Sequence, residues 1–213
     1  MDRLVFRDVR NSDLSDIKDI IDDSWDWVDL FESEGSLEAT LGLYLNMVLY
    51  ESSFTKVAVH NGKIVGVIMG YVEGDEPKGR LLMDDSASFA LKLMNTTKND
   101  RKAAYKYLSK TRVIYEEMFE EVGIDYDANL VFFVVSEDAR GLNIGKLLWL
   151  ELLEYFKQKE VRSVYLFSDT ECNFGFYDHI GFTKKTEREV EFTFGGEPED
   201  FSQTIFLYDY FID

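Results

Sequence analysis

The stretch Val135-Ser-Glu-Asp-Ala-Arg140-Gly-Leu-Asn-Ile-Gly145-Lys-Leu-Leu148 is the most informative part of this sequence. It follows the apolar run Leu130–Val135, which predicts a buried strand, and it leads directly into a helical pattern. The first N–H groups of a helix have no internal partners and attract anions. The stretch therefore indicates a phosphate-binding loop, to which Arg140 adds a positive charge. The residues expected on the buried face of the helix are Ile144, Leu147, Leu148, Leu152 and Tyr155.

A second segment of the same kind lies farther along the chain. Ser163–Ser168 predicts another buried strand, and it precedes Asp169-Thr-Glu-Cys-Asn173-Phe-Gly-Phe-Tyr177-Asp-His-Ile-Gly181-Phe182. Alone, the first segment is equally compatible with an ordinary strand–loop–helix connection in which Gly141 only makes the turn. Two such strand–helix segments in this order and spacing form a much more specific pattern than either one.

Together the two segments resemble the signatures of the GNAT family, the acetyl-CoA-dependent N-acetyltransferases. In that family, the pattern Gln/Arg-x-x-Gly-x-Gly/Ala wraps the pyrophosphate of coenzyme A, and a later helix with Phe-Tyr-x-x-x-Gly-Phe lines the thiol end. Arg140, Ile144 and Gly145 match the first pattern, in which Gly141 is also common. The second pattern matches completely, in Phe176-Tyr177 and Gly181-Phe182.

The sequence departs from the family pattern at Asn143, which stands where the family has its middle glycine. Asn is the residue that most readily replaces Gly at positive φ, so we expect a positive φ here and a loop of unchanged shape. The resemblance implies that the coenzyme contacts the end of the strand, the loop and the second helix. The implied residues are Phe133, Val134, Val135, Arg140, Gly141, Leu142, Asn143, Ile144, Gly145, Lys146, Asn173 and Tyr177. Asn173 could equally cap the second helix.

The resemblance assigns the role of catalytic acid to Tyr177. The attacking nucleophile is the neutral amine, which makes up only about one molecule in 2,500 at pH 7 for an amine of pKa near 10.4. The departing thiolate needs a proton or a strong hydrogen bond. A phenol has a pKa of about 10 and an alkyl thiol about 8.5, so full proton transfer is uphill and hydrogen bonding can be the real contribution. The alternative is a tyrosine that only packs in the core.

The acceptor side is less well defined by sequence. Trp25, Trp27 and Glu73 are candidate substrate contacts, and for the two tryptophans simple packing is the alternative. No general base is identifiable, although Glu73, Asp127 and Glu137 are weak candidates. Cys172 is interpreted as a small buried residue and not as an acyl carrier, because it has no nearby cationic activator apart from His179.

Composition favours a cytoplasmic enzyme. At 213 residues and 46% apolar content, the chain suits one domain over 1–213, and no uncharged apolar run approaches the roughly 20 residues that span a bilayer. The start Met1-Asp-Arg leads directly into a strand pattern, so we expect no signal peptide and no membrane association. The single cysteine fits a reducing compartment, and His60 and His179 stand without cysteine partners, so we expect no metal.

The net charge of the chain limits the kinds of ligand that it is expected to bind. The chain has 23 basic and 41 acidic residues, which argues against nucleic acid because phosphates would be repelled. The acidity is compatible with a cationic amine, although the simpler reading is that it only keeps the protein in solution. Binding of polyanionic coenzyme A requires that positive character be concentrated around Arg140 and Lys146.

The remaining elements follow in an order that resembles the GNAT fold, a mixed and mostly antiparallel central sheet flanked by helices. Asn61-Gly62 predicts a tight hairpin between two strands. The segment 75–127 is predicted to be a helical insertion between the third and fourth strands. It could be a lid or specificity wall, a dimer surface, or a cover for a sheet edge. The other expected elements are strands at 4–9, 54–60, 63–72, 187–194 and 204–210, and helices capped by Ser12 and by Ser36.

The sequence as a whole predicts an acyltransferase that moves acetyl from acetyl-CoA to a primary amine by direct attack in a ternary complex. The acceptor is a small molecule or a peptide, and the protein is a monomer or a homodimer. The alternative is a catalytically silent acyl-CoA-binding or regulatory protein with the same fold. Retention of Tyr177 favours the enzyme, and the missing base favours the alternative.

Overall fold

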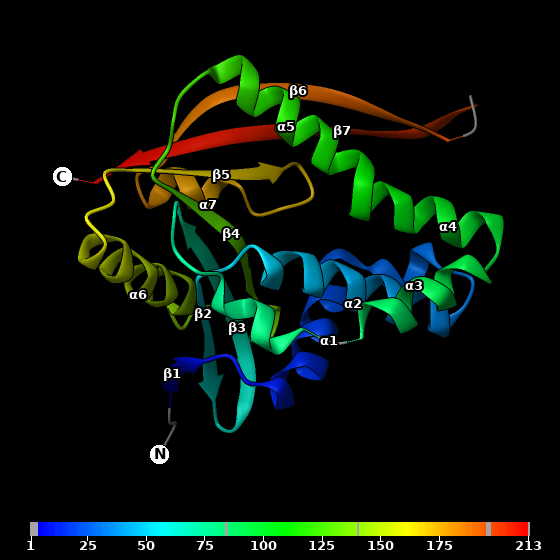
Figure 1. Ribbon diagram of the computed structural model, residues 1–213, viewed down its shortest axis with the longest axis horizontal. Coiled ribbons are helices and arrows are strands. Elements are labelled where there is room, and N and C mark those ends of the chain that lie inside the picture. Colours follow the sequence, from blue (N-terminus) through cyan, green and yellow to red (C-terminus); the bar gives the residue numbers. More distant parts are fainter. Residues whose placement is uncertain (1–3, 84, 140, 195–196, 213) are drawn as a thin grey trace.

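A seven-stranded mixed sheet forms the centre of the molecule, in the computed structural model that describes residues 4–83, 85–139, 141–194 and 197–212 (Figure 1). The strand order is β1-β2-β3-β4-β5-β7-β6, and every neighbouring pair is antiparallel except β4 and β5. The predicted fold class is thereby confirmed. The strands are β1 (Leu4–Asp8), β2 (Phe54–His60), β3 (Lys63–Val72), β4 (Ala128–Val135), β5 (Ser163–Asp169), β6 (Thr183–Phe194) and β7 (Glu197–Phe211).

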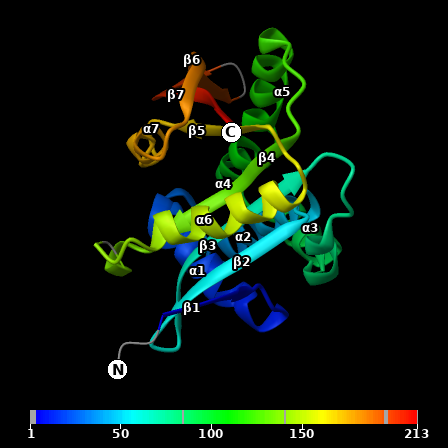
Figure 2. The same cartoon turned by 90° about the vertical axis from the view of Figure 1, so that its left-hand side faces the viewer.

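Helices cover both faces of this sheet. The α-helices are α1 (Leu14–Trp25), α2 (Glu34–Tyr50), α3 (Ser86–Met94), α4 (Lys98–Tyr105), α5 (Thr111–Val122), α6 (Ile144–Gln158) and α7 (Gly175–His179). In Figure 2, α6 lies across β2, β3 and β4 on one face, whereas α1 and α2 lie behind the same strands. The segment between β3 and β4 is helical, as expected, and a π-helical turn at Lys106–Lys110 joins α4 to α5. Among the described residues, no helix has both the length and the apolar character to cross a bilayer.

Local turn chemistry was predicted correctly at the β2–β3 hairpin and incorrectly at two helix starts. Asn61 and Gly62 have φ values of 52° and 85°, the left-handed geometry that this turn requires. Helix α1 begins after Asp13, whose buried carboxylate pairs with Arg7, so the prediction that Ser12 caps this helix is wrong.

Helix α2 is capped one turn earlier than predicted. The Ser33 side chain accepts a hydrogen bond from the Ser36 N–H at 3.2 Å, so the predicted cap at Ser36 is wrong. Both serines stand near the helix start, and Ser33 is the one whose extended backbone turns its oxygen toward the free amides.

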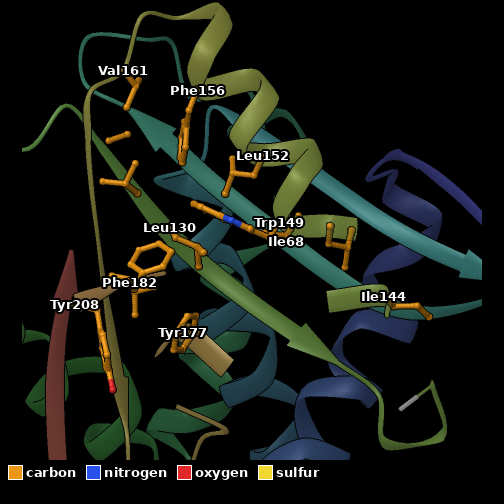
Figure 3. Packing of buried hydrophobic residues seen from close by; sticks show 14 of the residues in the cluster. Ile68, Leu130, Ile144, Trp149, Leu152, Phe156, Val161, Tyr177, Phe182 and Tyr208 are labelled. Carbon is orange, nitrogen blue, oxygen red and sulfur yellow. The ribbon is translucent and has the colours of Figure 1, made fainter. Parts of the chain in front are cut away.

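Helix α6 packs very closely on the sheet because β3 contributes two glycines beneath it. A Cβ atom at Gly70 would lie 2.6 Å from Leu152 Cδ1, and one at Gly66 would lie 3.0 Å from Leu148 Cδ1. Figure 3 shows Leu152 and Phe156 pointing from α6 toward the strands. The prediction that Leu147 belongs to this buried face is wrong, because that side chain is 37% exposed. The residues of α6 that are buried are Ile144, Leu148, Trp149, Leu152 and Phe156.

Candidate active site

The strands β4 and β5 separate soon after they meet. They pair in parallel only at Ala128 with Val164 and at Asn129 with Tyr165. Beyond this point they diverge toward their carboxyl ends, as Figure 1 shows. The edge of β4 that faces β5 is therefore left without a strand partner from Leu130 onward, which makes its backbone N–H and C=O groups available to a ligand.

A β-bulge in β4 lies at the start of this open edge. Met69 of β3 pairs with Phe132 and Gly70 pairs with Leu130, so Val131 is the extra residue. The bulge reverses the alternation of side chains. Leu130 packs in the cluster that contains α6, whereas Phe132 packs in the cluster that contains α1 and α2. The bulge thus turns Phe132 toward the opposite face of the sheet.

The loop between β4 and α6 has the shape expected of an anion site. Gly141 has a φ of 83° and Asn143 a φ of 57°, so the prediction of a positive φ at Asn143 is confirmed. Asn143 occupies the N-cap position of α6, and its side chain makes no capping hydrogen bond. The first amides of α6 therefore remain available for an external anion. Arg140 lies outside the described residues, and Lys146 is exposed.

A substitution series at Asn143 tests whether this backbone geometry matters for coenzyme binding. Asn143→Gly should retain acetyl-CoA binding, because Gly adopts positive φ without strain. Asn143→Val should weaken binding by about 1–3 kcal/mol, the cost of forcing a β-branched residue into this region. Isothermal titration of acetyl-CoA into the three proteins measures the difference. Equal dissociation constants for all three would show that the position has no special role.

Gly145 sits in the first turn of α6, where it allows three elements to meet. A Cβ atom there would lie 3.2 Å from the Phe176 ring of α7 and 3.5 Å from the Phe133 ring of β4. The first turn of α6 and the end of β4 therefore pack directly against the helix that carries Tyr177.

Tyr177 is both packed in the core and exposed to a cavity. It is 8% exposed, and its ring lies 6.0 Å from that of Phe182 and 5.9 Å from that of Tyr208, centre to centre. It also lines the cavity described below. Burial, and then the charges of Cys172 and Asp169, raise the pKa of Tyr177 well above its usual range. The phenol therefore keeps its proton and remains a hydrogen-bond donor.

Helix α7 is short, and this changes the interpretation of Asn173. The helix begins at Gly175 with Phe174 in the N-cap position, so the interpretation of Asn173 as a cap is wrong. Asn173 is exposed in the turn that precedes the helix, and its contact with the coenzyme stays a prediction.

A cavity of about 340 Å³ lies where β4 and β5 separate. Of the three predicted acceptor-side residues, Trp25 and Trp27 line it, whereas Glu73 is exposed just beyond the end of β3 and does not. Helix α5 forms part of the wall and also packs on β6 and β7, so the segment between β3 and β4 lines the cavity and covers the sheet. The aromatic residues of the lining are Trp25, Trp27, Tyr44, Tyr107, Tyr115, Phe119, Phe132, Phe133, Tyr165, Phe167 and Tyr177.

The acidic residues of the cavity were not found from sequence. They are Glu51, Glu116, Asp169 and Glu171. Arg112 lies 2.5 Å from the Glu51 carboxylate and 3.5 Å from that of Glu116, and Lys106 lies 4.0 Å from that of Glu171. Burial raises the pKa of Glu171. The available signal was position in the sequence, since Asp169 directly follows the predicted strand Ser163–Ser168 and opens the second signature segment.

The three carboxylates considered from sequence as weak candidates for the base do not line the cavity. Asp127 instead accepts hydrogen bonds from the N–H groups of Arg162 and Ser163, at 2.9 and 3.0 Å, which lower its pKa and fix the start of β5. Glu73 and Glu137 are exposed. The structure therefore favours a structural role for Asp127.

Cys172 also lines the cavity, and it is half-buried where a fully buried residue was expected. Burial, followed by the charge of Asp169, raises its pKa to about 12. A thiol with that pKa is almost entirely protonated at neutral pH, and the thiolate is the nucleophile. This agrees with the interpretation that Cys172 is not an acyl carrier.

Comparison with solved structures shows where this fold occurs. The PaiA N-acetyltransferase of Thermoplasma acidophilum, in complex with coenzyme A, has a TM-score of 0.54 at 15% identity, over 99% of this chain and 99% of that chain. An N-acetyltransferase of Staphylococcus aureus has a TM-score of 0.55 at 12% identity, over 98% of each chain. An agmatine N-acetyltransferase has a TM-score of 0.57 at 13% identity, over 98% and 99%. At such identities these likenesses establish the fold.

Comparison by sequence finds a family model that matches part of the chain. No curated protein matches the chain in sequence. Residues 114–182, which include the loop before α6 and all of α7, match the acetyltransferase (GNAT) family. This match lies in the part of the chain that carries the two predicted signatures, and it agrees with the predicted resemblance to the acetyltransferase (GNAT) family.

Proposed function

We propose that the protein transfers an acetyl group from acetyl-CoA to a primary amine, by direct attack in a ternary complex. The observation that carries this proposal is the cavity between β4 and β5. The lining of this cavity includes the open edge of β4, the protonated phenol of Tyr177, and aromatic and acidic side chains. Thioester and amine would need to meet in such a space.

The residues around the loop fit coenzyme A. The uncapped start of α6 and the positive φ values of Gly141 and Asn143 suit a pyrophosphate, and the unpaired edge of β4 suits the amide groups of the pantetheine arm. When bound, acetyl-CoA supplies a thioester whose carbonyl carbon accepts the amine. Phe133, Val134 and Val135 belong to β4, and their contact with the coenzyme, which the resemblance implies, is part of this proposal.

The chain supplies two kinds of hydrogen-bond donor that would stabilise negative charge during the reaction. Backbone N–H groups on the open edge of β4 can donate hydrogen bonds to the negative oxygen that develops at the acetyl carbonyl. Tyr177 donates its phenolic hydrogen to the departing sulfur. Its raised pKa makes it a poor acid for full proton transfer but keeps it a donor, so we assign to it hydrogen-bond stabilisation of the thiolate.

The experiment that tests this function combines calorimetry with acetyl-CoA and a thiol-release screen over amines. We expect acetyl-CoA to bind, and free coenzyme A to be released only when a particular amine is present. Binding without release for any amine would favour the alternative, an acyl-CoA-binding or regulatory protein. Failure of acetyl-CoA to bind would reject both.

A further inference from the structure

We propose that the acceptor amine carries an unbranched apolar tail, and that this tail lies in a second cavity next to the one between β4 and β5. This inference rests on the proposed function and names the substrate class of the same site. We call the cavity between β4 and β5 the reaction cavity. The second cavity has a volume of about 380 Å³ and lies between α2 and parts of the segment that joins β3 to β4.

The two cavities share a boundary. Met47 and Glu51, one helical turn apart at the end of α2, line both of them, and so does Arg112 of α5. From this boundary the reaction cavity extends to β4 and β5, whereas the described lining of the second cavity comes from helices and the turns beside them. An acceptor whose amino group reacts beside Tyr177 and whose tail leaves between α2 and α5 therefore places that tail in the second cavity.

An exposed ion pair spans this boundary. Arg112 Nη2 lies 2.5 Å from Glu51 Oε1, and Arg112 Nε lies 3.5 Å from Glu116 Oε1. The side chains of Arg112 and Glu51 are 50% and 35% exposed, so water screens their charges and the pair holds α2 and α5 together only weakly. Exposed side chains also change rotamer quickly. The guanidinium can therefore turn aside and let an alkyl chain pass without a movement of either helix.

Apolar side chains line most of the second cavity. Leu43, Met47, Met83 and Leu108 are half-buried, so they keep apolar surface that a ligand can cover. Each methylene group that covers such surface leaves water and adds affinity. The two methionines are unbranched and flexible, which lets them adapt to the shape of a chain. This lining suits a flexible hydrocarbon.

The polar side chains of the second cavity are largely satisfied without a ligand. Asn46, which is 3% exposed, donates a hydrogen bond from Nδ2 to Ser86 Oγ at 2.7 Å. Tyr50 is 50% exposed, so water can satisfy its hydroxyl group. A peptide would bring N–H and C=O groups that need partners when they are buried, whereas an alkyl tail brings none. The lining therefore favours an alkyl tail over a peptide.

The test compares n-butylamine with n-octylamine as acceptors for the full-length protein at saturating acetyl-CoA, with release of free coenzyme A as the readout. The two probes carry the same amino group and differ only in chain length. Each buried methylene group contributes about fourfold in affinity. We expect kcat/KM to be about 15- to 250-fold higher for n-octylamine, the effect of burying roughly two to four more methylene groups. Equal values for the two amines would overturn the proposal.

Met83→Gln tests whether the tail lies in the second cavity. The change keeps the length of the side chain and adds a polar amide, at a residue that lines the second cavity and not the reaction cavity. It should lower the ratio of kcat/KM for n-octylamine to that for n-butylamine by about 4- to 15-fold, the loss of roughly one or two buried methylene groups. An unchanged ratio in the folded variant would place the tail elsewhere and overturn the proposal. The wild-type comparison decides the matter if the variant does not fold.

Met94→Gln is the matched control, since it makes the same change at a residue of α3 that is 72% exposed and lines neither cavity. It should leave the ratio unchanged, and an equal fall in this variant would overturn the proposal. A capped pentapeptide with a central lysine between glycines is the competing acceptor. We expect a lower kcat/KM for this peptide than for n-octylamine, and a higher value would replace the alkyl tail by a peptide.

The same measurements separate this inference from the proposed function. If acetyl-CoA stabilises the protein and another amine of the screen releases coenzyme A, but n-octylamine is no better than n-butylamine, only the apolar tail is wrong. If acetyl-CoA neither stabilises the protein nor loses its acetyl group to any amine, the proposed function itself is rejected.

Discussion

Replacement of Tyr177 by Phe should lower kcat by about 10²–10⁴, the usual effect of losing a positioned acid. The change removes only the hydroxyl group, so the ring contacts with Phe182 and Tyr208 should persist and acetyl-CoA affinity should change little. Because the hydrogen bond to the departing sulfur exists mainly in the transition state, kcat and kcat/KM should fall together. Steady-state kinetics with the acceptor found in the amine screen provides the measurement.

Two controls make this result specific. Tyr208→Phe makes the same chemical change in a neighbouring ring that does not line the cavity, and it should leave kcat near the wild-type value. An acyl donor with a more acidic thiol needs less help in leaving, so Tyr177→Phe should recover much of its rate with such a donor. Wild-type turnover of Tyr177→Phe with acetyl-CoA, under conditions where chemistry is limiting, would make Tyr177 a packing residue.

The raised pKa of Tyr177 also predicts the shape of the pH profile. A phenol with the ordinary pKa of about 10 would begin to lose its proton, and its ability to donate, as the pH approaches that value. Since burial moves this ionisation to higher pH, Tyr177 should cause no loss of rate between roughly pH 7 and pH 10. A fall in wild-type kcat over this range that is absent from Tyr177→Phe would contradict the assignment.

The double substitution Arg140→Ala and Gly145→Glu should abolish the rise in melting temperature that acetyl-CoA produces. A ligand at a hundredfold excess over its dissociation constant stabilises the folded state by about 2.7 kcal/mol, and this gain should disappear. The new carboxylate would occupy the first turn of α6, where it competes with the pyrophosphate for the same amides. Differential scanning fluorimetry with and without acetyl-CoA gives the result directly.

This experiment needs controls for charge and for folding. Arg101→Ala with Gly35→Glu makes the same change in net charge on α4 and α2, with no atom within 4 Å of the new Cβ at position 35, and it should keep the full shift. At Gly145 the new Cβ would lie 3.2 Å from the Phe176 ring, so the melting temperature of the coenzyme-free protein has to be compared as well. If that temperature collapses, Arg140→Ala alone carries the test. An undiminished shift in a folded double variant would reject the loop as the pyrophosphate site.

Local chemistry explains which parts of the fold could be predicted. The Asn61–Gly62 turn and the positive φ of Asn143 depend on one or two residues whose steric preferences are strong, and both were predicted correctly. The buried face of α6 was predicted only in part. Apolar periodicity predicted that Leu147 is buried. In the structure, the glycines of β3 allow a close approach of α6 in which Trp149 and Phe156 face the sheet. The angle at which a helix meets a sheet depends on residues far away in sequence.

The same reasoning separates the parts of the site that sequence revealed from those it did not. The loop residues and Tyr177 were predicted because they belong to contiguous patterns. Trp25 and Trp27, which were predicted on the acceptor side, line the same cavity as Tyr177. The carboxylates Asp169 and Glu171 were missed. In the sequence, neither residue can be told from an ordinary surface carboxylate. The two lie in one cavity with the aromatic residues of α2 and α5 because β4 and β5 separate.

The sequence by itself therefore determined the order of the elements, the turn geometry and the resemblance to a family, because these depend on short patterns and on steric preferences of single residues. The tertiary structure alone decided where the cavity lies and which charges line it. The physical reason is the bulge at Val131 together with the early end of pairing between β4 and β5. One extra residue in a strand leaves almost no trace in apolar periodicity, yet it turns Phe132 to the opposite face of the sheet, where it lines the cavity.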